Sequence, residues 1–215
     1  MRPNFPLMSR FMQAGIVAVA LAGVVTNNLA WVPAAVISLL VSFIPSILRR
    51  DLKLVLPIEL NFWIVLSLFL HVVGGFSGFY DHVPGWDHLT HAMSATLIGA
   101  LGFVVVVAVD KYVASIRLPR RFLGFFILMF TMAMGVLWEI MEFANDSLLG
   151  THLQYGLTDT MLDLLFDGFA AFVVGIAGAH YLVHVTEEHF LEQLQADQAR
   201  KKLVDIWRRR KLKKR

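Results

Sequence analysis

Three short segments of this chain place carboxylates and imidazoles at the edges of long apolar runs. The first lies between Gly85 and His91, and the other two begin near Glu139 and Asp159. Their ionisable side chains are Asp87, His88, His91, Glu139, Glu142, Asp146, Asp159, Asp163 and Asp167. Carboxylates and imidazoles are the side chains that bind divalent metal ions and transfer protons. The pattern predicts one polar site that three apolar segments bring together.

The composition sets the class of protein that must carry this site. Of the 215 residues, 57% are hydrophobic and only 16% are charged, which is typical of a membrane protein. There is no cysteine. Disulfides, thiolate metal sites and cysteine nucleophiles are therefore excluded.

Six apolar runs are long enough to be read as membrane spans. They cover residues 11–25, 31–48, 56–73, 86–109, 122–143 and 158–185. We predict an all-α polytopic membrane protein, with a bundle of six transmembrane helices in residues 1–185 and a basic tail in residues 186–215. A cleaved signal peptide is the alternative interpretation of the first run.

The basic residues fix the predicted orientation. All 19 Lys and Arg residues lie at the N-terminus (Arg2 and Arg10), in residues 49–53, in residues 111–121 or in the tail. If each apolar run crosses the membrane once, these four segments all lie on the same side of it. The positive-inside rule then places them, and with them both termini, in the cytoplasm of a cell-membrane protein. The acidic segments then lie toward the outer face.

Span length predicts that the acids enter the membrane. Without its acids the fifth run covers only residues 122–137, which is shorter than the ~20 residues of a full crossing. The acids also continue, at helical spacing, into stripes of small residues that favour close helix packing. These stripes are Ala95, Gly99 and Gly102; Gly135 and Thr131; Ala171, Gly175 and Ala179.

Matched depth predicts that His91, Glu142 and Asp163 meet in one coordination sphere. Glu139 and Asp167 are expected about one turn deeper. Because no Lys or Arg accompanies them, these acids cannot all stay ionised in a low-dielectric pocket unless a cation neutralises them. We expect a divalent ion (Zn, Mn, Mg or Fe), with His88, Asp167 and His71 as further ligands. Asp87, Asp159 and Thr160 are expected to orient the ligands through hydrogen bonds.

In these motifs the chain resembles the YjdF-like family of small prokaryotic multi-pass membrane proteins, for which no activity is established. The shared pattern is Asp-x-x-x-His, then Glu-x-x-Glu, then Asp-Thr-x-x-Asp. Here these motifs are Asp87 and His91, Glu139 and Glu142, and Asp159, Thr160 and Asp163. The resemblance covers roughly residues 55–185 and implies a common membrane fold and a common site.

Three classes of function fit this pattern. The first is a metal-dependent enzyme that acts on a lipid or lipid-linked substrate, with Glu139 or Glu142 as general base. The second is a cation or proton transporter, and the third is a binding or assembly protein with a structural polar cluster. The inner halves of the spans offer few polar residues for a transport route, which favours the enzyme.

The tail adds one expected partner besides the bilayer. Apolar residues interrupt its charges, which is typical of a helix on an anionic membrane surface. A merely solvated tail is the alternative. Nothing in the sequence supports nucleic-acid binding, and no signal indicates an oligomeric state.

Overall fold

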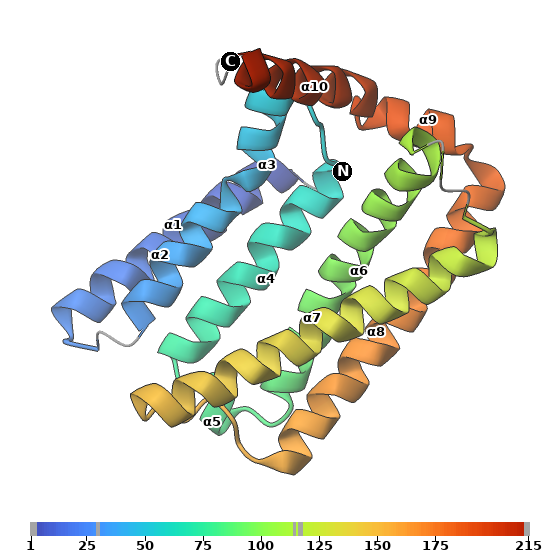
Figure 1. Cartoon of the computed structure of the whole chain (residues 1–215). Coiled ribbons are helices and arrows are strands. Elements are labelled where there is room, and N and C mark those ends of the chain that lie inside the picture. The colour runs from blue at the N-terminus through green and yellow to red at the C-terminus, as the bar shows by residue number, and fades with distance from the viewer. Residues whose placement is uncertain (1–3, 29–30, 114, 116–117, 213–215) are drawn as a thin grey trace. The chain divides into compact units, whose positions relative to one another are not determined.

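The computed structural model describes residues 4–28, 31–113, 115 and 118–212, and over this part of the chain it is built from helices (Figure 1). Six helical segments among the described residues are long and apolar enough to cross a membrane, which confirms the predicted fold class. The chain divides into two compact units, one formed by residues 80–186 and one by the segments on either side of it. The predicted division at residue 185 stays a prediction. Arg2, Arg117 and residues 213–215 of the predicted basic segments lie outside the described residues.

The first unit contains three packed helices, α1 (Phe5–Val25), α2 (Trp31–Ser42) and α4 (Ile58–Phe76). Their core consists of Ile16, Ala35 and Val72, which have no exposed surface. A turn follows α1, and Asn27 adopts a positive φ of 57° there. Asparagine tolerates this left-handed conformation better than most residues.

The second span is not the continuous helix that the sequence predicted. α2 is followed by α3 (Ile44–Ile47) and by a π-helical turn, η1 (Leu48–Leu52). Pro45 lies in this region, and a proline removes one backbone donor from a helix and clashes with the preceding turn. The break after Ser42 has this cause.

The tail forms two further helices of the first unit, α9 (Glu187–Gln193) and α10 (Ala196–Leu212). Val55 N–H donates a hydrogen bond of 2.9 Å to the carbonyl of Leu194, just before α10. Leu194 is buried. The tail is thus joined to the segment that precedes α4.

The second unit contains the short α5 (Phe79–His82) and three long helices, α6 (Trp86–Tyr112), α7 (Arg120–Leu149) and α8 (Leu157–His184). The small-residue stripes face inward as predicted, apart from Ala179, which is exposed. Gly178 is buried in its place, and a Cβ added there would lie 2.8 Å from the Phe103 ring. A strict four-residue spacing drifts off a 3.6-residue helix, so the buried face passes from Gly175 to Gly178.

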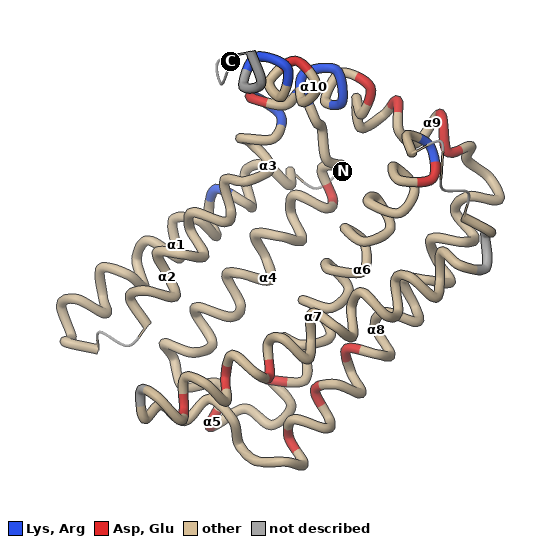
Figure 2. The backbone as a smooth tube through the Cα atoms, viewed as in Figure 1, with Lys and Arg blue, Asp and Glu red and all other residues tan. Residues whose placement is uncertain are grey.

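Charge is segregated along the three long helices of the second unit. The acids lie mainly toward the α5 end (Figure 2), whereas Lys111 lies in the last turn of α6, at the other end of that helix. We call the α5 end the acidic end. It begins with Gly85, whose positive φ of 76° turns the chain into α6. This turn places Asp87, His88 and His91 on the first turns of α6.

Candidate metal centre

His91 is the centre of the acidic end and is 8% exposed. Its Nε2 lies 3.8 Å from Asp87 Oδ1 and 3.8 Å from Glu139 Oε1. Its other ring nitrogen, Nδ1, lies 3.5 Å from Asp167 Oδ1. Carboxylates from all three helices thus surround one imidazole, because α6, α7 and α8 present their small-residue faces to each other.

His88 contacts a different acid of the same cluster. Its Nδ1 forms a hydrogen bond of 2.8 Å with Asp163 Oδ1, and Asp163 is 2% exposed. The His88 ring stacks on Phe166, with 5.1 Å between the ring centroids. Stacking and hydrogen bonding together fix the plane of this imidazole.

Two groups of three side chains are compact enough to hold a metal ion. One consists of Asp87, His91 and Asp163, and the other of His88, Asp159 and Asp163. In each group the candidate ligand atoms lie within 4.8 Å of one another. We call these the first and the second triad; they have Asp163 in common. Oxygen-rich sets with one imidazole suit Mn, Mg, Fe or Zn.

Glu139 approaches the first triad at His91 and is 6% exposed. Its Oε2 accepts a hydrogen bond of 3.4 Å from Gln154 Nε2, whereas its Oε1 has no hydrogen-bond partner in the described part of the chain. Unpaired buried carboxylate oxygens are costly and rare in native proteins. The Oε1 atom is thus left without a hydrogen bond, at 3.8 Å from His91 Nε2.

Gln154 was not singled out by the sequence, and Asp146 explains its position. The Asp146 carboxylate accepts hydrogen bonds from the Thr151 hydroxyl and from the backbone N–H groups of Leu153 and Gln154, at 2.6 to 3.0 Å. These bonds fold the loop after α7 back over the helix end. The Gln154 amide then reaches Glu139. Asp146 thus organises a loop and belongs to neither triad.

The remaining predicted residues lie as follows. Glu142 is in neither triad, and its Oε1 accepts a 2.8 Å hydrogen bond from the Trp138 indole one turn earlier on α7. Glu139 contacts His91 instead. The Thr160 hydroxyl lies 3.4 Å from Gln154 Nε2, on the loop side of Glu139. His71 belongs to α4 of the first unit, where its ring packs edge-on against Trp31.

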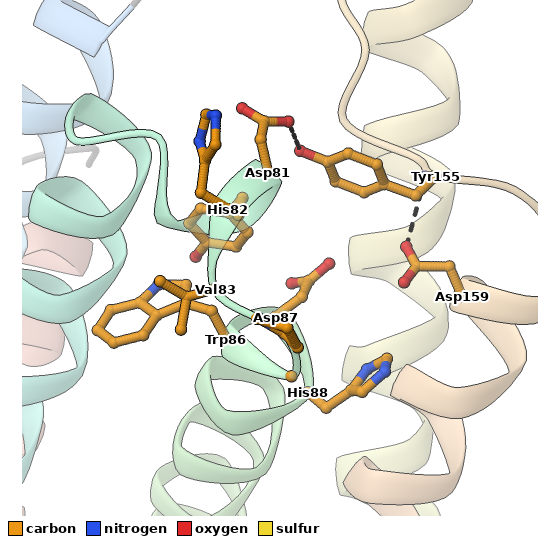
Figure 3. Close-up of a pocket in the computed structure, with 11 residues that line it drawn as sticks. Asp81, His82, Val83, Trp86, Asp87, His88, Tyr155 and Asp159 are labelled. Carbon is orange, nitrogen blue, oxygen red and sulfur yellow. Dashed lines mark hydrogen bonds between the residues drawn. The ribbon is translucent and has the colours of Figure 1, made fainter.

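A cavity of about 160 Å³ adjoins the triads (Figure 3). Its lining includes Asp87 of the first triad and His88 and Asp159 of the second. In Figure 3 these side chains, from α6 and α8, approach one another below the loop that carries Tyr155. The cavity thus borders one residue of the first triad and two of the second.

Two tyrosines of the cavity wall are held as neutral phenols. The Tyr155 hydroxyl donates a 2.8 Å hydrogen bond to Asp81, and burial together with this bond raises the pKa of Tyr155. Burial likewise raises the pKa of Tyr80, whose hydroxyl lies 3.2 Å from that of Thr90. Both remain hydrogen-bond donors at neutral pH.

The fold and this site define a polytopic α-helical membrane protein with a carboxylate–histidine cluster at one end of a three-helix unit. The chain belongs to the predicted membrane protein family DUF2238, whose model matches residues 8–184. This confirms the expected family of multi-pass prokaryotic membrane proteins. An uncharacterised protein of Thermotoga maritima is 32% identical over 130 residues, which cover 58% of this chain and 64% of that protein. No solved structure matches the chain.

Proposed function

We propose that this protein is a metal-dependent membrane enzyme that acts on a lipid or lipid-linked substrate. One observation carries the proposal: two triads of metal-ligating side chains, from α6 and α8, lie beside a cavity. Ionisable side chains at membrane depth are costly and by default serve a function. A divalent ion supplies the positive charge that this end of the unit lacks.

Different residues of the chain bind the ion, orient its histidine ligand and transfer protons. Asp87, His91 and Asp163 hold the ion, and Asp167 orients His91 by accepting a hydrogen bond from its Nδ1–H group. A bound divalent ion polarises a substrate oxygen or activates water. The Glu139 carboxylate, fixed on one side by Gln154, then accepts a proton through its free Oε1 atom. Glu142 is the alternative base, because it lies one turn from Glu139 on the same helix.

Charge restricts how the substrate is bound. Residues 80–110 and 122–186 contain no Lys or Arg. An anionic group of the substrate therefore has to be bound through metal rather than by basic side chains. The cavity, with the Tyr80 and Tyr155 phenols in its wall, takes the polar part of the substrate.

An enzyme fits the helices better than a transporter. Beyond Thr131, the buried faces of α6, α7 and α8 carry apolar and small side chains, with Phe130 facing Gly102 and Phe103 facing Gly178. A transported ion needs polar groups along its whole path. The carboxylates and histidines of the cluster instead end at His91, Glu139 and Asp167, within the half of each helix next to the acidic end.

The proposal is tested with purified full-length protein in detergent and in liposomes. We expect a divalent ion to co-purify and to be lost in Asp163→Asn, as measured by elemental analysis. Liposomes of phosphatidylethanolamine and phosphatidylglycerol are then followed by mass spectrometry for altered lipids, with Asp163→Asn as the inactive control. Absence of any divalent ion from the wild-type protein, even after metal is added, overturns the proposal. Ion flux without lipid turnover supports the transporter instead.

We also propose that both termini face the cytoplasm and that the tail binds anionic lipid. The first proposal rests on the segregation of Lys and Arg. The second rests on the exposed Leu203, Ile206 and Trp207 beside the basic end of α10. Cysteines introduced at His82 and His152 should react with impermeant reagents only from outside. A peptide of residues 196–215 should bind vesicles containing phosphatidylglycerol and not neutral vesicles.

A further inference from the structure

We propose that the metal centre holds two divalent cations bridged by Asp163, the outer one facing the cavity; this rests on the proposed function, since it concerns the same site.

The first position lies between His91, Asp87 and Asp163. The 3.8 Å separations from His91 Nε2 to Asp87 Oδ1 and to Glu139 Oε1 are too long for hydrogen bonds. Two ligands bound at ~2.1 Å to one ion lie roughly 3 to 4.2 Å apart, depending on the angle between them. The spacing thus fits an ion better than a direct contact. The buried Glu139 Oε1, which makes no hydrogen bond in the described part of the chain, approaches the same His91 Nε2 atom.

The second position lies between His88, Asp159 and Asp163. The two triads form separate groups that have only the Asp163 carboxylate in common. One carboxylate has two oxygens with about four acceptor sites, so it is able to bind two ions at once. Bridged pairs of catalytic ions lie about 3.5 to 4 Å apart. An ion here replaces the proton that His88 and Asp163 now share, because metal ligands bind in their deprotonated form.

The charge balance also favours two ions. The carboxylates of the two triads and the two further carboxylates that approach His91 carry up to five negative charges (Asp87, Asp159, Asp163, Glu139 and Asp167), and residues 80–110 and 122–186 contain no Lys or Arg. With neutral imidazoles as ligands, one divalent ion leaves three of these charges uncompensated, and two ions leave one. Asp167 keeps His91 as its hydrogen-bond partner.

The two positions differ in their access to the cavity. Two residues of the second triad, His88 and Asp159, line it, whereas Asp87 is the first-triad residue in its wall. The second ion therefore has more of its ligands at the cavity and is the one proposed to touch the substrate, and the first ion lies toward His91, beside Glu139. Glu139 would then accept a proton from a water molecule that the ions activate.

The test counts ions in metal-depleted full-length protein that is titrated with Mn²⁺. We expect two ions per chain and an exchange-coupled pair in the electron paramagnetic resonance spectrum. Asp159→Asn should lose the second ion and Asp87→Asn the first, with an affinity loss of at least about tenfold at the altered position. Asp163→Asn should abolish the coupling. Asp81→Asn, an equal change in the cavity wall outside both triads, should still bind two.

Each outcome decides between the two proposals. One ion per wild-type chain, lost in Asp87→Asn and kept in Asp159→Asn, overturns the pair but leaves the metal enzyme standing. No bound ion overturns both. Two ions in Asp159→Asn show that the second triad is not a metal position. If Asp163→Asn fails to fold, the number of ions bound by Asp159→Asn still decides. The Asp159 side chain is only partly buried, so this variant is expected to fold.

Discussion

Each of the two units packs three long helices together, but the residues buried between the helices differ. In the first unit, α1, α2 and α4 meet around Ile16, Ala35 and Val72, and a few hydroxyl groups supply the buried polarity. In the second unit, α6, α7 and α8 bury Glu139, Asp163 and Asp167 at one end of the same kind of three-helix contact. Apolar and small side chains therefore suffice to pack three helices. The acids of the second unit are present for another purpose, because burying them costs stability.

The largest effect should come from the apolar core of the first unit. Ile16→Ala removes a side chain with no exposed surface, and such deletions cost about 2 to 5 kcal/mol. We expect a lower melting temperature with unchanged metal content, measured by thermal unfolding in detergent and by elemental analysis. Loss of metal in this variant would break the comparison, since it would show that the first core controls the site.

Metal removal should act on the second unit. A ligand that binds only the native state at about 100 times its Kd adds about 3 kcal/mol of stability. Chelation should therefore lower the melting temperature and speed hydrogen exchange in the acidic ends of α6 and α8. Exchange in α1 and α4 is the internal control. A melt that does not respond to chelator contradicts the proposed metal.

A smaller effect is expected where α7 approaches α8. A Cβ at Gly135 would overlap Asp167 Oδ2, so Gly135→Ala should displace the acid that orients His91. Overpacking of this kind costs about 1 to 3 kcal/mol, and metal affinity should fall as well. Gly124→Ala is the matched control on the same helix, because nothing lies within 4 Å of its added Cβ. Equal metal affinity in both variants would argue against the role of Asp167.

The smallest effect should appear in the cavity wall. Tyr155→Phe removes the hydrogen bond to Asp81, which is worth about 0.5 to 1 kcal/mol at such an exposed position. Folding raises the pKa of Tyr155, so its contribution is present below the unfolded value of about 10 and is lost as the pH rises through the folded value. The variant should thus be less sensitive to alkaline pH than the wild type. Melting curves at pH 8 to 11 measure the difference. Parallel curves for the variant and the wild type would show that Tyr155 contributes no pH-dependent stability.

Much of the fold was predictable from the sequence because apolar length and helical spacing depend on local composition. All six spans and the inward faces of Gly99, Gly135 and Gly175 follow from these two features. The extent of α7 does not. The apolar run ends at about Phe143, and the predicted fifth span ends there. In the structure the helix continues to Leu149, since Asp146 binds the following loop from within the helix, and Gly150 ends it at a positive φ of 67°.

The sequence predicted which residues lie close together at the site, but not which of them contact each other. Spacing placed His91 and Asp163 together, but it could not separate Glu139 from Glu142, which lie on the same helix face. Their difference depends on two tertiary or local hydrogen bonds, from Gln154 to Glu139 and from Trp138 to Glu142. Asp87, expected to orient a ligand, instead lies among the candidate ligands. Only the rotation of each helix about its axis fixes such choices.

The hydrogen bond between Val55 and Leu194 has a consequence for biosynthesis. It joins two segments of the first unit, and the whole second unit lies between them in the chain. A ribosome adds roughly 5 to 20 residues per second, so Leu194 is made about 7 to 28 seconds after Val55, once α6, α7 and α8 have been synthesised. The second unit is continuous and is able to assemble during translation. The first unit is completed only after its C-terminal helices emerge, so chains interrupted after α8 leave the backbone donor at Val55 without this partner.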